Sequence, residues 1–282
     1  MSLEAFFLPV TSGRLFCLLH RPAGELEVKG AVLYVHPFAE EMNRSRRMAA
    51  LQAKAMASAG YMVLQVDLFG CGDSAGDLAD ATWESWIANL VEAGAWLSAQ
   101  AGVALCWWGL RTGALLAAEA AGRIGQPCRL LLWQPVMLGE QYLQQFLRLK
   151  IASELMSGGA EGMMNRLKVQ LAEEGAVEIA GYALTSSLAR GLEGAELAIP
   201  EVARRTDLIE VSSGGTGELS AAVGAWLAKW RAAGRAIRAA KPTPTNAADT
   251  TLNASVAAEP KKMPEVMPRS SMAPNTGAAR QK

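Results

Sequence analysis

Histidine and paired cysteines are scarce in this sequence. The chain of 282 residues has two histidines, His20 and His36, and both lie near its beginning. The four cysteines, which show no paired spacing, are Cys17, Cys71, Cys106 and Cys128. Without a histidine-rich segment or a Cys-x-x-Cys pair, the sequence predicts no metal site. Glycine motifs typical of nucleotide binding are also missing from strand-to-helix positions, so no cofactor is predicted.

Net charge and long apolar runs are lacking as well. The formal net charge is zero, which gives no general attraction to nucleic acid or to a charged membrane surface. No apolar run reaches the roughly 18 residues that a membrane span needs. The first ten residues have no basic stretch followed by a long apolar one, so no secretory signal is expected. The sequence therefore predicts a cytoplasmic protein that binds no nucleic acid and has no membrane span.

What the chain does contain is apolar sequence in a regular order. With 51% hydrophobic residues it can bury one large core, in a single domain of about 200 to 250 residues. Short apolar runs that read as buried strands occur at 31–35, 61–67, 103–108, 130–133 and 207–212. They alternate with helical patterns, which predicts an α/β fold with a mostly parallel central sheet flanked by helices. Residues 6–10 and 13–20 predict an antiparallel hairpin at the edge of that sheet.

Two segments depart from this alternation. Residues 136–200 carry helical patterns at 140–157, 162–174 and 181–190, which predict a helical cap over the carboxyl ends of the strands, where such sheets bind ligands. Residues 241–282 hold six of the twelve prolines and no aromatic residue, so a disordered tail is expected. The predicted organisation is a domain at 1–240, with the cap at 136–200, and a tail at 241–282.

The most informative stretch is the run WWGLRTG at 107–113, between an apolar strand pattern and an alanine-rich helical pattern. A buried strand, a sharp turn flanked by glycines and a helix form the geometry of a nucleophile elbow, usually spelled Gly-x-Ser-x-Gly. Here the central residue is Arg111. A guanidinium stays protonated and cannot attack a carbonyl carbon. The sequence therefore favours the frame of an elbow and argues against its usual reaction.

Three blocks, each following a predicted strand, together resemble the α/β-hydrolase fold: HPF at 36–38, DLFGCGDS at 67–74 and GLRTG at 109–113. More narrowly, HPFAEEMN at 36–43, the elbow and GYAL at 181–184 resemble the second group of exosortase A system-associated hydrolases. The likeness covers residues 1 to roughly 240. It implies a bacterial cytoplasmic protein encoded near exosortase and exopolysaccharide genes. Because this fold normally ends with a further strand and helix, the sequence raises the question of whether the last strand, which only 235–240 could begin, is missing.

A serine hydrolase of this fold needs a nucleophile, then an acid, then a histidine, in that order along the chain. The acid position is predicted at Glu218, after a glycine-rich approach at 214–217. No histidine follows the elbow. His36 is expected to hold a loop, and the backbone N–H groups of Phe38 and Thr112 are expected to form the oxyanion hole. Hydrolase activity is thus uncertain.

Two interpretations of Arg111 remain open. At the start of a helix a guanidinium can bind a carboxylate or phosphate, which predicts an anionic small molecule or acyl-type ligand in the former active site. Alternatively, Arg111 pairs with an internal acid and locks the loops. The candidate acids are Glu40, Glu41, Asp67 and Glu218.

Other functions need a different nucleophile or none. Cys71 with His36 as its base would make an ester or thioester hydrolase or an acyltransferase. Ser74, in the same loop as Cys71, is expected to make local turn hydrogen bonds. A third hypothesis is a scaffold that uses the cap and the tail to contact other proteins of its pathway.

Overall fold

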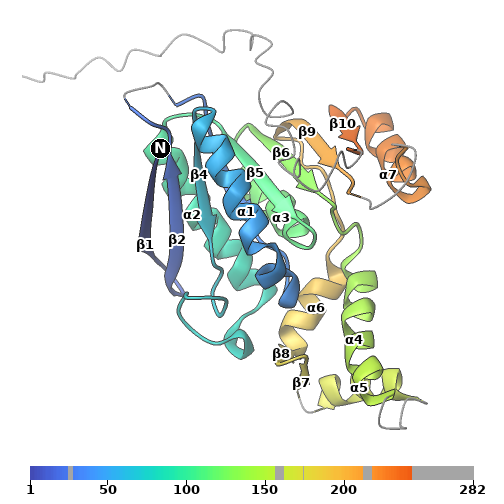
Figure 1. Cartoon of the computed structure of the whole chain (residues 1–282). Coiled ribbons are helices and arrows are strands. Elements are labelled where there is room, and N and C mark those ends of the chain that lie inside the picture. Colours follow the sequence, from blue (N-terminus) through green and yellow to red (C-terminus); the bar gives the residue numbers. More distant parts are fainter. Residues whose placement is uncertain (25–27, 156–161, 174, 212–217, 243–282) are drawn as a thin grey trace, which may run out of the picture.

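A computed structural model describes residues 1–24, 28–155, 162–173, 175–211 and 218–242. Its centre is an eight-stranded sheet in the order β1-β2-β4-β3-β5-β6-β9-β10 (Figure 1). The strands are β1 (Ser2–Val10), β2 (Gly13–Arg21), β3 (Gly30–Val35), β4 (Tyr61–Val66), β5 (Leu105–Leu110), β6 (Cys128–Trp133), β9 (Ala203–Ile209) and β10 (Ile237–Ala240). β2 pairs antiparallel with β1 and β4, and the pairs from β4 to β10 are parallel. The predicted fold class is confirmed.

Helices cover both faces of this sheet (Figure 1). They are α1 (Glu40–Ser58), α2 (Trp83–Ala101), α3 (Gly113–Ile124) and α7 (Ala221–Ala232). Trp107 joins the larger core cluster with α2, α3 and α7, whereas its neighbour Trp108 joins the smaller cluster with α1. This division follows from the alternation of side chains along β5. No described helix is long and apolar enough to cross a membrane.

Between β6 and β9 the chain forms a separate layer at the end of the sheet (Figure 1). It contains α4 (Gly139–Leu155), α5 (Met163–Glu173), the hairpin of β7 (Ala176–Ile179) and β8 (Tyr182–Thr185), and α6 (Ser186–Gly194). The prediction of one helix over 181–190 is wrong in its first half. Ala180 and Gly181 have φ of 51° and 83°, and two consecutive positive φ values make a tight hairpin turn that ends any helix.

The last strand of the fold is present. β10 pairs in parallel with β9, with Ile237 opposite Thr206 and Ala240 opposite Ile209. It is only four residues long, which explains why the sequence pattern left its existence open. Of the predicted tail, residues 243–282 lie outside the described part of the chain.

Candidate functional site

Arg111 occupies the apex of a sharp turn between β5 and α3. Its φ is 53°, a left-handed conformation that costs a non-glycine residue about 1–2 kcal/mol. A Cβ on Gly109 would lie 2.5 Å from the Cα of Ala114, and one on Gly113 would lie 2.2 Å from the carbonyl oxygen of Val35. Both glycines are therefore required by close backbone approach. The turn has the strand-turn-helix geometry of an elbow.

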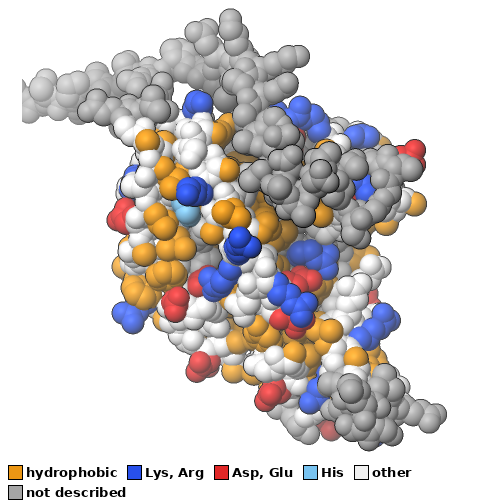
Figure 2. Space-filling view, in the orientation of Figure 1, with side chains coloured by type: hydrophobic (Ala, Val, Ile, Leu, Met, Phe, Trp, Pro, Cys, Tyr) orange, Lys and Arg blue, Asp and Glu red, His pale blue; other side chains and the backbone are white. Residues whose placement is uncertain are grey.

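The Arg111 side chain turns towards α1 and the cap. Its Nε donates to Oε1 of Glu41 at 3.3 Å, and its Nη1 donates to the backbone oxygen of Gln134 at 3.5 Å. Its guanidinium carbon lies 5.8 Å from the centre of the Tyr142 ring, which belongs to α4. Figure 2 shows acidic and basic side chains side by side where the first turns of α1 face the cap. Among the four predicted acids, Glu41 is thus the partner in the structure.

This ion pair is only partly enclosed. The side chains of Arg111 and Glu41 are 29% and 31% exposed. Oε2 of Glu41 is nevertheless buried. Burial raises the pKa of the Tyr142 phenol, and the negative charge of Glu41 raises it further. Tyr142 therefore stays neutral, and its hydroxyl interacts with the Glu41 carboxylate.

Of the two amides expected to form the oxyanion hole, one is already occupied. The backbone N–H of Phe38 donates to Oγ1 of Thr112 at 2.8 Å, and Thr112 is buried. The Phe38 ring packs against Phe146 of α4, with the ring centres 5.0 Å apart. A substrate oxygen could use the Phe38 amide only after the Thr112 hydroxyl had moved away.

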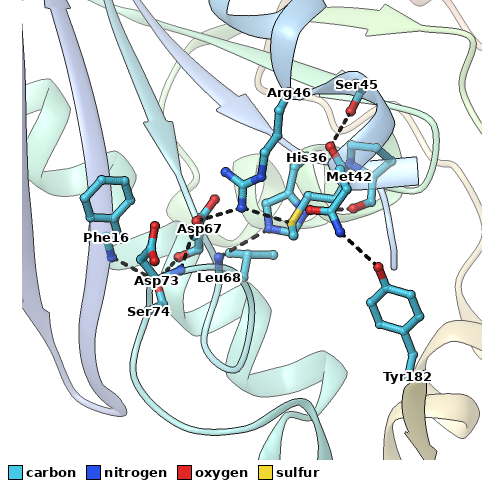
Figure 3. Close-up of polar contacts among 12 residues, drawn as sticks. Phe16, His36, Met42, Ser45, Arg46, Asp67, Leu68, Asp73, Ser74 and Tyr182 are labelled. Carbon is cyan, nitrogen blue, oxygen red and sulfur yellow. Dashed lines mark hydrogen bonds and ion pairs between the residues drawn. The ribbon is translucent and has the colours of Figure 1, made fainter. Parts of the chain in front are cut away.

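His36 joins the loops that follow β3 and β4. Its Nδ1 donates to the backbone oxygen of Pro37 at 2.7 Å, and its Nε2 accepts the backbone N–H of Leu68 at 3.3 Å, as Figure 3 shows for the Leu68 contact. The carbonyl can only accept, which assigns the proton to Nδ1. Burial lowers the pKa of His36. The ring is therefore neutral and has both nitrogens engaged, as expected for a histidine that holds a loop.

Cys71 and Ser74 lie in the loop after β4. Burial raises the pKa of the Cys71 thiol to about 12, and the charge of Asp67 contributes in the same direction. The Cys71 thiol is therefore not ionised, and both ring nitrogens of His36 are engaged in hydrogen bonds. These two observations argue against Cys71 with His36 as a catalytic pair. The Ser74 hydroxyl donates to the backbone oxygen of Asp67 at 2.6 Å and accepts the Phe16 N–H at 2.8 Å (Figure 3). Ser74 stabilises the turn.

Asp67, the residue after β4, is held by a second ion pair. Its Oδ2 accepts from Nη2 of Arg46 at 2.9 Å and from the backbone N–H of Asp73 at 3.3 Å (Figure 3). Gly72, with φ of 55°, closes over the carboxylate, since a Cβ there would lie 1.9 Å from Oδ2. Asp67 is thus committed to Arg46 and to the loop, and it does not partner Arg111.

No family model and no curated protein matches the chain, but solved structures do. A protein of Butyrivibrio proteoclasticus solved with ferulic acid bound is 14% identical, with a TM-score of 0.62 over 84% of this chain and 89% of the other. A thermostable carboxyl esterase of Bacillus coagulans is 15% identical, with a TM-score of 0.55 over 86% and 90%. An α/β serine hydrolase without a lid from Xanthomonas campestris is 15% identical, with a TM-score of 0.52 over 86% and 85%.

This chain has the α/β-hydrolase fold. In that fold the acid follows the penultimate strand, which here is β9. The predicted acid, Glu218, is exposed, and the glycine-rich approach at 214–217 lies outside the described residues. Sequence reasoning missed Glu210, which follows β9 directly, is buried and accepts the Ser220 N–H with Oε2 at 2.8 Å. The sequence does contain a signal for Glu210, namely an acidic residue next to an apolar strand. The strand predicted at 207–212 included Glu210, so it was not recognised as a residue that follows the strand.

The third position of an α/β-hydrolase triad follows the last strand, and it holds no histidine. β10 ends at Ala240 and the chain continues with Lys241 and Pro242. Both histidines of the sequence precede the elbow. In the described part of the chain, no three His, Cys, Asp or Glu side chains form a group that could hold a metal ion.

A small apolar cavity lies between the elbow, α2 and the cap. Its volume is about 10 Å³, enough for roughly one water molecule. Its lining residues are His36, Pro37, Phe38, Trp83, Trp86, Thr112, Leu116, Leu188 and Leu192. The polar atoms of His36 and Thr112 are engaged elsewhere, so the cavity offers apolar contacts. The polar groups of the site gather instead around Arg111.

Proposed function

We propose that this α/β-hydrolase-fold protein lacks serine-hydrolase chemistry and binds an anionic small molecule at Arg111, in the position of the former active site. The observation that carries the proposal is the apex itself, where a permanently charged guanidinium replaces the nucleophile and meets one carboxylate at 3.3 Å. The absence of a histidine after β10 supports the loss of chemistry, because no base could accept a proton from a nucleophile at the elbow.

The geometry suggests how an anion would bind. A guanidinium has five N–H donors, and Arg111 uses two of them in the contacts to Glu41 and the Gln134 carbonyl. The positive end of the α3 dipole adds to the attraction. A carboxylate with an apolar tail could take over the place of Glu41 and lay its tail against the rings of Tyr142 and Phe38, which are 6.4 Å apart. Such an acyl-type acid is the ligand class that suits the site.

Loss of chemistry can be tested with a fluorophosphonate probe, which labels activated serines. We expect no label on the full-length protein. The variant Arg111→Ser has the usual elbow sequence Gly-x-Ser-x-Gly at 109–113. This variant should also remain unlabelled, because no histidine follows the last strand. Stoichiometric labelling of the unchanged protein would overturn this part of the proposal, and its loss in Ser74→Ala would assign the nucleophile to Ser74.

Ligand binding can be tested with hexanoate at constant ionic strength. Binding to the folded state should raise the melting temperature in a saturable way. Arg111→Gln should abolish the shift. Arg44→Gln is the matched control, since Arg44 is a largely exposed arginine of α1 that contacts Glu40 at 3.9 Å. A shift that survives Arg111→Gln, or no shift in the unchanged protein, would contradict an anion site at the elbow.

We further propose that the chain belongs to the exosortase A system-associated hydrolase 2 group and acts in the cytoplasm, in contact with other proteins of an exopolysaccharide pathway. The motifs at 36–43, 109–113 and 181–184 support the group. The four cysteines are free thiols, as a reducing compartment would leave them. Deleting the gene in its bacterium should alter the exopolysaccharide or the proteins sorted to the surface. Unchanged levels of both would contradict the assignment.

A further inference from the structure

Three arginines from neighbouring strands surround one buried acid in the part of the sheet formed by β6, β9 and β10. Oδ1 of Asp207 accepts from Nη2 of Arg205 and from Nε of Arg238, each at 2.9 Å. Nε of Arg205 also lies 2.8 Å from Oδ2, and Nη2 of Arg129 lies 3.9 Å from it. We refer to these three arginines and Asp207 as the arginine cluster.

Sheet register brings these side chains together. On the parallel strands β6, β9 and β10, Arg129 lies opposite Arg205, and Arg238 lies opposite Asp207. Neighbouring strands are about 4.8 Å apart, so in-register side chains of one face stand next to each other. Leu131, opposite Asp207, packs against the core cluster under α1, which places the arginine cluster on that face. The arrangement is therefore built into the sheet.

The charges in the arginine cluster do not balance. Three guanidiniums face one carboxylate, which leaves an excess of two positive charges. The arginine side chains remain 43% (Arg129), 29% (Arg205) and 58% (Arg238) exposed, whereas Asp207 is buried. Each guanidinium has five donors, and Asp207 engages one or two of each. Donors and charge are therefore available to a ligand that approaches from solvent.

We propose that the arginine cluster is a binding site for a phosphate group, either inorganic phosphate or a phosphate monoester. All three guanidiniums converge on the carboxylate of Asp207, so their remaining donors lie close enough together to contact one small anion from the solvent side. A phosphate dianion also matches the excess of two positive charges, and arginine is suited to bidentate contacts with phosphate. Asp207 would position Arg205 and Arg238, which lowers the entropy lost when the anion binds.

Charge argues against the chain's own C-terminal segment as the occupant. Residues 243–282 contain five basic and three acidic side chains, a net charge of +2, and this segment would be repelled. Nor does the site depend on the proposed function, because Arg111 is not among its residues. The two can fail separately.

The test uses the full-length protein and isothermal titration with inorganic phosphate at constant ionic strength. We expect saturable binding of one phosphate, weakened about tenfold or more by Arg238→Gln and by Arg129→Gln, since one charge-assisted contact contributes on that scale. Arg204→Gln is the matched control, because Arg204 is the exposed neighbour of Arg205 and lies at the β-bulge of β9. It removes the same charge without touching Asp207 and should leave the affinity unchanged.

Arg111→Gln should also leave phosphate binding unchanged, which separates this site from the elbow. Glycerol phosphate in place of inorganic phosphate distinguishes the two sources of the group. Tighter binding of the monoester assigns the site to a phosphorylated metabolite, and equal or weaker binding assigns it to the free ion. The proposal is overturned if no saturable binding occurs, or if Arg238→Gln and Arg204→Gln reduce the affinity equally.

Discussion

Two ion pairs connect α1 to the ends of central strands, and they differ in how completely the acid is enclosed. In the first, Arg46 of α1 contacts Asp67 at the end of β4; in the second, Glu41 of α1 contacts Arg111 at the end of β5. The Asp67 side chain is 10% exposed and accepts a second hydrogen bond from the loop that closes over it. Glu41 is 31% exposed, contacts Arg111 at 3.3 Å and interacts with the Tyr142 hydroxyl, and no loop in the described part of the chain closes over it as one does over Asp67.

The difference shows how the same chemical pair can serve two purposes. A buried carboxylate must have its partners, because leaving it unpaired costs several kcal/mol. Ion pairs at the surface contribute only about 0–1 kcal/mol, so a partly exposed pair costs less to open than a buried one. Asp67 with Arg46 is therefore a structural lock, whereas Arg111 with Glu41 is the exchangeable pair of our proposal, which an external anion would open.

Gly72→Ala should have the largest effect. The new Cβ would lie 1.9 Å from Oδ2 of Asp67 and would need a positive φ, so we expect the free energy of unfolding to fall by about 3 kcal/mol or more. Gly102→Ala is the control, since it has a similar φ of 64° and no atom within 4 Å of the new Cβ. It should cost about 1 kcal/mol. Urea unfolding measures the free energy of unfolding of both variants. Equal losses for Gly72→Ala and Gly102→Ala would show that the close packing of the loop over Asp67 does not contribute to stability.

Asp67→Asn and Glu41→Gln compare the two acids directly. Asp67→Asn leaves Arg46 without its charge partner, and because Arg46 is 42% exposed we expect a loss of about 2 kcal/mol, less than for a fully buried pair. Glu41→Gln should change stability by no more than about 0.5 kcal/mol. Chemical unfolding at pH 7.5 measures the difference. A larger loss in the free energy of unfolding for Glu41→Gln than for Asp67→Asn would mean that Glu41 with Arg111 is the structural pair and that Asp67 with Arg46 is not.

Acid should weaken the loop region that contains Asp67. Burial lowers the pKa of His36 from its ordinary value of 6.5. Below that pH, His36 is protonated in the unfolded chain but stays neutral in the folded chain, which favours unfolding. Stability is then complete above about pH 7 and falls with acidification by up to about 1.4 kcal/mol per unit. Unfolding at pH 7.5, 6.5 and 5.5 measures the slope. His36→Gln should reduce it over this range, and an unchanged slope would assign the effect to another group.

The smallest effect concerns the exchangeable pair. Glu41→Gln removes the internal competitor for Arg111, so hexanoate should bind several-fold more tightly and shift the melting temperature at lower concentration. Asp67→Asn should leave the hexanoate affinity unchanged, because Asp67 does not contact Arg111. Weaker binding after Glu41→Gln would mean that Glu41 orients Arg111 for the ligand and does not compete with it.

Much of this arrangement was visible in local sequence. The order of strands and helices follows from hydrophobic patterns, and the elbow follows from GLRTG at 109–113, because both depend on residues that are close along the chain. The arginine at position 111 and the lack of a histidine after residue 36 are likewise read from residue identities alone. The hairpin at 176–185 was missed because four-residue strands give too few residues for a reliable period.

Local hydrophobic patterns and residue identities were sufficient to predict the fold class and the arginine at the apex of the elbow. Three contacts are visible only in the folded chain: Glu41 pairs with Arg111, Thr112 accepts the Phe38 amide, and three arginines meet at Asp207. Those contacts join residues that are far apart in sequence or held in register by strand pairing. Their distances follow from how the strands pair and the helices pack, which no short stretch of sequence specifies.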